Sequence, residues 1–458
     1  MVDYDSRRYH VNALLPYAEC HFQSDLQAFE EPVAVLQQNA NRVGIGGCYS
    51  FMSQFISLEL PVDVLERLNG RSDYDDLEDA LLYSRLAHER QHFIQNVSTT
   101  YGMWKTSILR MAGMCAFGCI MLQNKSGGFA IAPPYMDKFP TSDVVLRDCK
   151  EPVTMAAEAA MFRNWVRLVD GPVAASKKCA AMHIDGVTFP EGTTHVHTID
   201  TVGVRGILAA NEIIEFQART AELDCLYHTK GMSSPHRDEI IPTIWSDHPS
   251  QSPLRISDRA FDRRDRLSWL ASLAMSELAL NADWPFLTVG TLQSRRWEDL
   301  QPGWRFARLC DYVREMKLTP PDDDPAARQI FKDRLAAALG WASEREALRR
   351  AILSLETGPL CRTIFFEVAR SASSFLENRP CDLSITSSRD PAFALIIGRY
   401  CAGPLSTYSP PKDLEACTLD IALQLLLSDH IVCPYCFRRD HEEGCEGIRV
   451  VGFLMSDR

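Results

Sequence analysis

The sequence predicts an α+β protein that is predominantly α-helical. Residues 73–100 contain neither proline nor glycine, and their apolar side chains recur at the spacing of one helix face. From residue 258 onward the chain reads as a series of helical segments with charged surfaces. One stretch near the start, residues 48–60, is aromatic and apolar between a Gly-rich turn and Pro61, which predicts a small β element.

The first half of the chain is expected to contain four helices. Residues 73–100 form the first of them, and residues 101–123 form a very apolar second helix that packs against it. Pro152 is well placed as the first residue of a helix that runs to about residue 169. Residues 171–201 are expected to be irregular or short-stranded, and residues 206–228 form the fourth helix.

A Pro/Ser-rich connector then divides the chain into predicted domains. We expect an N-terminal domain over residues 1–230, a linker over 231–257, a helical C-terminal domain over 258–430 and a short tail over 431–458. Helices of the C-terminal domain are predicted at 258–280, 303–316, 326–339, 344–355, 362–376, 391–400 and 413–427.

Composition and charge narrow the classes of function. The 458 residues are 46% hydrophobic and carry a net charge of −12, which indicates a globular protein and argues against nucleic acid or a membrane as the main partner. The polar start of the chain predicts no secretory signal, and the apolar stretch 111–122 is too short to span a bilayer. The 15 cysteines are therefore expected to be reduced thiols in a cytoplasmic protein.

One motif indicates a chemistry directly. Residues 88–92 read His-Glu-Arg-Gln-His, the H-E-x-x-H pattern, inside the first expected helix. Positions i and i+4 share a helix face, so His88 and His92 can offer two imidazole nitrogens to one metal ion. Glu89 lies about 100° around the helix from His88, where it can reach a water on that metal without being an equivalent ligand. Two histidines with an adjacent Glu general base are typical of a zinc hydrolase.

A second candidate metal site lies in the tail. Cys433, Cys436, His441 and Cys445 have the spacing C-x2-C-x4-H-x3-C, one residue shorter before the last cysteine than a usual zinc knuckle. Two thiolates on a tight turn, followed by a His and a Cys, can complete a tetrahedral shell. The pattern predicts one structural zinc ion in a short hairpin. The alternative is three reduced cysteines without a metal.

His88, Glu89 and His92 resemble the motif of the zincin metallopeptidases, and the resemblance covers only this short stretch. It implies a zincin-like N-terminal domain that contains the small β element. It also implies that His88 and His92 bind a catalytic zinc ion and that Glu89 activates a zinc-bound water. The substrate implied is a protein or peptide.

The third ligand separates the zincin subgroups. The pattern with a third histidine six residues after the second is absent, because Ser98 stands at that position. The gluzincin type takes a Glu from a following helix, and no Glu occurs between residues 93 and 150. Glu215 is our choice, because it falls on the apolar face of the helix expected over 206–228. That face is made by Ile207, Ala210, Ile214, Ala218, Ala221 and Cys225.

Other third ligands stay open. Glu215 stands 123 residues after His92, a long separation, and an i,i+4 ion pair with Arg219 would also explain its position. The alternative ligands are Glu158, Glu212, Glu222, His195 and His197.

The leading hypothesis is a zinc peptidase whose helical C-terminal domain recruits or restrains the substrate. A non-enzymatic interaction protein held together by zinc is the first alternative; the tail cluster favours it and Glu89 argues against it. A di-iron carboxylate protein is the second. Glu89-x-x-His92 fits half of such a site, but the chain has no second Glu-x-x-His. The sequence does not indicate the oligomeric state.

Overall fold

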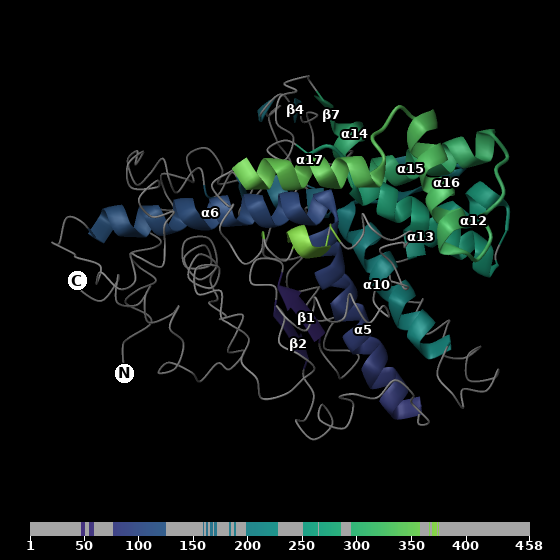
Figure 1. Cartoon of the computed structure of the whole chain (residues 1–458), viewed down its shortest axis with the longest axis horizontal. Helices are drawn as coiled ribbons and strands as arrows, with labels where there is room; N and C mark the ends of the chain where they lie inside the picture. The colour runs from purple at the N-terminus through teal and green to yellow at the C-terminus, as the bar shows by residue number, and fades with distance from the viewer. Residues whose placement is uncertain are drawn as a thin grey trace.

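The structure is a computed structural model, and most of its described residues lie in helices (Figure 1). It describes residues 47–50, 55–58, 77–124, parts of 159–188, 198–227, 251–263, 265–284, 295–357 and some residues between 366 and 374. Helices account for 78% of the described region, which confirms the predominantly α-helical prediction. Within the same region, the search for a helix with the length and hydropathy of a membrane span finds none.

The strands are short and form three small sheets. β1 (Gly47–Ser50) and β2 (Phe55–Leu58) pair antiparallel, so the stretch predicted as one strand contains two. β3 (His183–Ile184) pairs antiparallel with β4 (Val187–Thr188), which pairs in parallel with β7 (Arg295–Arg296).

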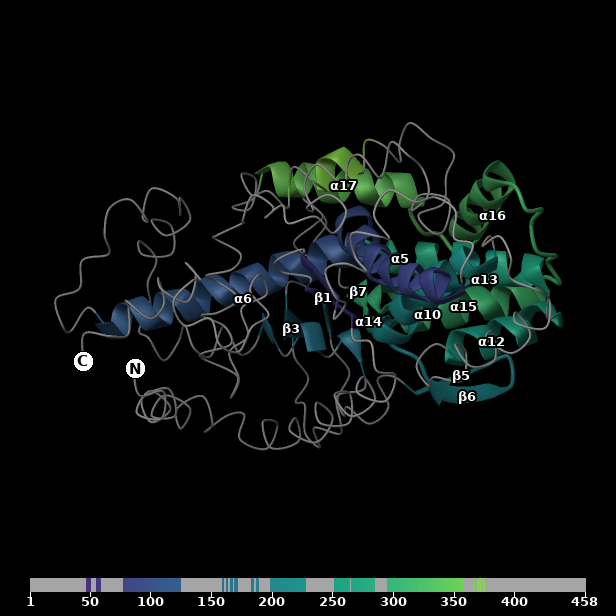
Figure 2. The same cartoon turned by 90° about the horizontal axis from the view of Figure 1, so that it is seen from below.

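β5 (Thr198–Thr201) and β6 (Val204–Ile207) form a tight hairpin. Val202 and Gly203 turn the chain with φ angles of 48° and 74°, as a two-residue hairpin turn requires. Figure 2 shows this hairpin beside the C-terminal helices. Ile207 ends β6 and is 48% exposed, so its predicted place on the apolar face of the next helix is wrong.

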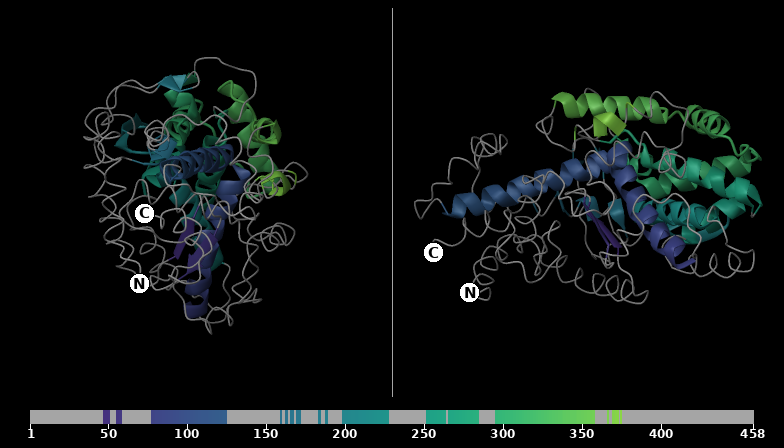
Figure 3. Two further views of the ribbon diagram at one scale, coloured as in Figure 1. Left: turned by 90° about the vertical axis from the view of Figure 1, so that its left-hand side faces the viewer. Right: turned by 60° about the horizontal axis from the view of Figure 1, so that its bottom comes forward.

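The H-E-x-x-H motif lies on α5 (Leu77–Ser98), which meets α6 (Thr100–Asn124) at a corner. The Thr99 hydroxyl caps α6 by accepting the backbone N–H of Gly102 at 3.0 Å. Figure 3 shows the far end of α6 reaching past the described C-terminal helices. Phe93 and Val97 are fully buried, as the apolar pattern of α5 predicts.

α10 (Ala210–Tyr227) lies side by side with α5 (Figures 1 and 2). Its start is fixed by Glu212, whose carboxylate accepts the N–H of Ala209 at 2.8 Å. Ala210, Ile214, Ala218 and Ala221 are buried, in agreement with the apolar face predicted for them. α10 therefore packs through this face in the interior of the protein, and it contacts the motif helix.

The described C-terminal helices are α12 (Gln251–Phe261), α13 (Arg266–Leu280), α14 (Trp297–Leu300), α15 (Pro302–Glu315), α16 (Pro325–Ala338) and α17 (Glu344–Thr357). The single helix predicted over 258–280 is wrong. The chain turns at Asp262, where φ is 52°, and Asp265 begins α13 with a capping box to Ser268.

One hydrophobic core joins both halves of the chain. It contains residues from α5, α6 and α10 together with residues from every described helix after residue 251. Trp104 of α6, for example, stacks on Trp284 just after α13, with ring centroids 4.3 Å apart. α12 also begins inside the stretch predicted as a linker. The predicted domain boundaries stay predictions, and the motif helix shares its core with the C-terminal helices.

A buried ionic cluster fixes the α5–α6 corner to the C-terminal helices. The Lys332 ammonium lies 2.7 Å from the carboxylates of both Glu277 and Glu344, and all three residues are buried. The Asn281 amide donates to Glu344 at 3.1 Å, and its oxygen accepts the N–H of Thr100 at 2.9 Å. Because these groups are buried and paired, removing any one of them leaves a costly buried charge or polar group.

Gly102 gives a direct test of the corner. A Cβ at this position would lie 2.4 Å from backbone atoms of Gln95 and Asn96. Ala is otherwise favoured over Gly in a helix by about 1 kcal/mol, but overpacking against backbone costs about 1–3 kcal/mol or more. We expect Gly102→Ala to lower the free energy of unfolding, as measured by denaturant titration. Gly206→Ala is the control, because nothing lies within 4 Å of its Cβ position. Equal stability of the two variants would contradict the close contact at the corner.

Candidate metal centre

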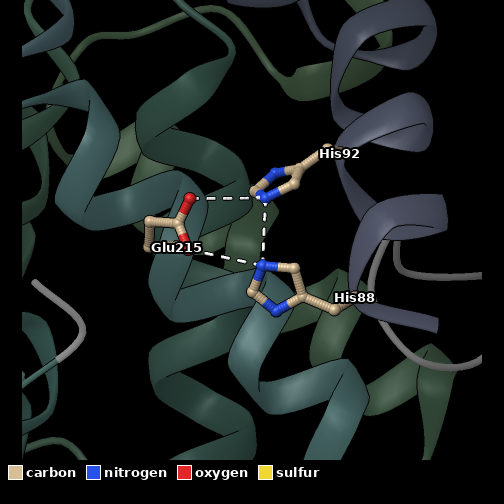
Figure 4. Close-up of side chains that lie close together, drawn as sticks. All are labelled: His88, His92 and Glu215. Carbon is tan, nitrogen blue, oxygen red and sulfur yellow. Dashed lines mark hydrogen bonds and ion pairs between the residues drawn. The ribbon is translucent and has the colours of Figure 1, made fainter. Parts of the chain in front are cut away.

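The structure brings His88, His92 and Glu215 together between α5 and α10. His88 and His92 lie one helical turn apart on α5, and Glu215 faces them from α10 (Figure 4). The two imidazole Nε2 atoms are 3.2 Å apart. Glu215 places one carboxylate oxygen 3.4 Å from His88 Nε2 and the other 3.3 Å from His92 Nε2. One ligand atom from each residue lies within 4.8 Å of the others, an arrangement that could hold a metal ion.

The hydrogen bonds of Gln95 define the tautomer of His92. The Gln95 side-chain amide group lies 2.9 Å from the backbone carbonyl of Ile214, which can only accept, so the atom facing it must be the NH2 group. The Gln95 oxygen therefore faces His92 Nδ1, at 2.9 Å, and accepts its proton. With Nδ1 protonated, the neutral ring has its free lone pair on Nε2, toward Glu215.

A carboxylate lies near the outer nitrogen of the His88 ring. Glu222 places an oxygen 3.4 Å from His88 Nδ1, and Arg219 donates to that oxygen at 2.8 Å. The Glu222 side chain is only 1% exposed, and the guanidinium beside it favours its charged form, which only accepts. The Glu222 carboxylate therefore favours a proton on His88 Nδ1, although the two atoms are farther apart than in an ordinary hydrogen bond. In that tautomer the Nε2 lone pair of His88 also points toward Glu215.

Four electron-pair donors thus converge on one point between the helices. They are the two Nε2 atoms and the two Glu215 oxygens, and none of them has a proton in the tautomers that Glu222 and Gln95 favour. Such a set repels itself unless a cation occupies the centre. A proton shared between the imidazoles is one such cation, and a metal ion is the other. Two imidazoles and a carboxylate are a donor set that suits zinc and other divalent transition metals.

The electrostatics of the centre favour positive charge. Burial of the His88 ring lowers its pKa, but hydrogen bonds to Glu215 and Glu222 and the charges of Glu215 and Glu89 outweigh it and raise the pKa to about 9. Burial alone would raise the pKa of Glu215. The charges of the two histidines and their hydrogen bonds to Glu215 outweigh this effect and hold the pKa well below its ordinary value. Without a metal ion, His88 therefore carries the compensating proton at neutral pH.

His88 links metal binding to pH. The metal must displace its proton, so the apparent zinc affinity is expected to rise about tenfold per pH unit between pH 7 and 9 and then to level off. The stability of the metal-free protein changes in the opposite sense. The raised pKa contributes stability below the ordinary value of 6.5, and this contribution is lost as the pH rises through 9. Competition with a chromophoric zinc chelator at several pH values measures the first effect. A flat affinity profile would contradict the charged His88.

Glu89 lies beside the centre and is 7% exposed. Burial raises the pKa of Glu89, and its electrostatic interactions with His88 and His92 partly offset this effect. Glu215 is the most accessible member of the centre, with 35% of its side chain exposed against 10% and 8% for the two histidine side chains. A carboxyl group with a raised pKa next to an accessible donor set is suited to exchanging protons with a bound molecule.

The other predicted ligands are placed as follows. The Glu212 carboxylate points back to the Ala209 N–H and does not face the Nε2 atoms of the two histidines. Burial raises the pKa of Glu212 to about 7. Glu222 faces His88 Nδ1, on the outer side of the ring. The ion pair of Arg219 is with Glu222, three residues on. Glu158, His195, His197 and the tail cluster Cys433, Cys436, His441 and Cys445 lie outside the described residues.

Sequence reasoning missed the residues that surround the ligands. Gln95 could have been found, because it lies one turn after His92 on the same helix. Gln217 and Ser276 come from α10 and α13, and no spacing in the sequence connects them with the motif.

Comparison of the whole chain with protein-family models, with curated proteins and with solved structures gives no match. The functional argument therefore depends on the residues and geometry of this chain.

Proposed function

We propose that the protein is a zinc-dependent peptidase of the zincin type, which hydrolyses peptide bonds of a protein substrate. The observation that supports this most is the position of Glu89, a buried acid adjacent to a centre of two histidines and a carboxylate from a neighbouring helix. A scaffold that only binds a metal has no need of an acid there. Three protein ligands with a position left for substrate or water are typical of a catalytic zinc site.

Each residue has a defined part in this proposal. His88, His92 and Glu215 hold the zinc ion, which supplies a Lewis acid for the scissile carbonyl and lowers the pKa of water toward ~7. Glu89 accepts a proton from the attacking water as its oxygen bonds to the carbonyl carbon. The same group then gives that proton to the leaving nitrogen as the C–N bond breaks. The raised pKa of Glu89 suits both transfers, because the base must also be able to return the proton.

We also propose a structural zinc ion at Cys433, Cys436, His441 and Cys445, on the basis of their spacing in the sequence.

Metal content and a cleavage screen test the proposal together. We would measure zinc by mass spectrometry in the purified chain and in the His88→Ala and Cys433→Ala variants. We expect two zinc ions in the wild type and one in each variant. We also expect the wild type to cleave members of a mixed peptide library, with loss of cleavage after chelation and recovery with zinc.

Two results would contradict the proposal. Zinc content unaffected by His88→Ala would mean that the motif helix binds none. Iron in place of zinc would favour oxidative chemistry, because two histidines and one carboxylate also bind ferrous iron in oxygenases.

A further inference from the structure

A chain of hydrogen bonds runs from His92 through the core to α13. Gln95 accepts from His92 Nδ1 at 2.9 Å and donates to the Gln217 oxygen of α10 at 3.0 Å. The Gln217 amide donates to the Ser276 hydroxyl oxygen at 2.7 Å. Ser276 in turn donates to the backbone carbonyl of Leu273 at 2.7 Å. Three separate helices thus contribute to one chain of hydrogen bonds, and this chain ends on a candidate metal ligand.

The direction of the chain is fixed at both ends. At one end, the carbonyl of Ile214 requires the Gln95 NH2 group to point away from His92. At the other end, the Leu273 carbonyl takes the Ser276 proton, so the hydroxyl oxygen is left to accept from Gln217. Reversing any link would place two acceptors or two donors face to face. The chain therefore has one self-consistent arrangement, and in it His92 keeps its proton on Nδ1.

Burial makes this arrangement costly to break. Gln95 and Ser276 are completely buried, and Gln217 is 2% exposed. Solvent water does not reach these side chains to replace a lost partner. Each lost hydrogen bond therefore leaves a buried polar group unsatisfied. The side chains are therefore held in one orientation, and the His92 ring is held with them.

We propose that Gln217 and Ser276 are positioning residues of the metal centre, which act through Gln95 to hold His92 with its Nε2 lone pair toward the metal. The inference rests on the metal site of the proposed function. If Gln217 and Ser276 position His92, α13 helps to hold the metal site. The C-terminal helices then have a role in the site itself, beyond the hypothesis that they recruit or restrain a substrate. Groups that orient a metal-binding histidine typically contribute about 10–100-fold in metal affinity.

α13 offers a matched control. Ser272 lies one helical turn before Ser276, is equally buried, and also donates to a carbonyl of its own helix, at 2.7 Å. Its oxygen, however, faces Ser257 of α12 and not Gln217. Ser276→Ala and Ser272→Ala therefore remove the same atom from the same helix, and only the first breaks the chain to His92.

The test compares these two variants and Gln217→Met with the wild type. We would measure zinc affinity by competition with a chromophoric chelator, and the protonation of the His92 nitrogens by 15N NMR of the metal-free, histidine-labelled protein. We expect about tenfold weaker zinc binding and a shifted His92 Nδ1 signal in Ser276→Ala, because Gln95 loses the support of Gln217 while Ile214 still orients its amide. Ser272→Ala should behave as the wild type in both measurements. Gln217→Met should lose at least as much affinity as Ser276→Ala, and it serves as the test if Ser276→Ala fails to fold.

The outcomes separate this inference from the proposed function. Equal zinc affinity and equal His92 signals in Ser276→Ala and Ser272→Ala would overturn the positioning role, even if the wild type cleaves peptides. A loss of affinity in Ser276→Ala would support it, even if no peptide is cleaved. A wild type whose zinc content does not depend on His88 would overturn the positioning role and the peptidase together.

Discussion

Glu89→Gln is expected to abolish peptide hydrolysis while the protein keeps its zinc. The amide has the size of the carboxylate but cannot take a proton from water, and loss of a general base typically costs about 10²–10⁴-fold in rate. Glu89 is not one of the residues that converge on the centre, so zinc content should be unchanged. The measurement is the rate of cleavage of a peptide found in the screen, beside zinc content by mass spectrometry.

Two comparisons make the Glu89 result specific. His88→Ala should lose one of the two zinc ions and cleavage together, because it removes a ligand of the catalytic ion. Glu298→Gln, an exposed glutamate of α14, should retain both. Cleavage by Glu89→Gln at the wild-type rate would mean that the acid beside the centre is not the base, and the peptidase hypothesis would be wrong.

The local half of the site could be predicted from the sequence because it is encoded within one helix. The separation of His88 and His92 by four residues places both rings on one face wherever α5 forms. Nothing outside residues 77–98 is needed for that conclusion. Glu89 follows from the same geometry.

The long-range half depends on how α10 packs, which spacing does not encode. The sequence named Glu215 as the third ligand and Glu222 as an alternative, and the structure gives them different partners: Glu215 faces both Nε2 atoms, and Glu222 faces His88 Nδ1. Which carboxylate meets which nitrogen is set by the register of α10 against α5. The sequence could therefore name the candidates and not their roles.

Turns caused the errors in the predicted elements. Val202 and Gly203 adopt positive φ and form the β5–β6 turn, which places Ile207 in a strand. A Val rarely adopts positive φ, so the sequence does not predict a turn there. The break between α12 and α13 depends on Asp262 and on the capping box of Asp265, inside a stretch whose apolar pattern runs through it. In both cases a local backbone choice overrides the periodicity of the side chains.

Glu215→Gln is expected to weaken zinc binding by more than about a hundredfold, since a residue that only orients a ligand already contributes about 10–100-fold. The amide removes the negative charge that lies within 3.4 Å of both Nε2 atoms and leaves a weaker donor. Without that charge, two histidines alone must stabilise the ion. Zinc affinity is measured by chelator competition at a pH above 9, so that the proton on His88 does not enter the comparison.

Glu212→Gln is the control for Glu215→Gln, because it makes the same chemical change one turn earlier on α10. Its carboxylate accepts a backbone N–H of Ala209, and a glutamine oxygen can do the same. Zinc affinity should therefore stay near that of the wild type. If Glu215→Gln retained wild-type affinity instead, the third ligand would have to come from elsewhere, with His195 and His197 as the next candidates. A loss in Glu215→Gln alone would assign the third ligand to α10, and the long separation from the motif would follow from the packing of α10 against α5.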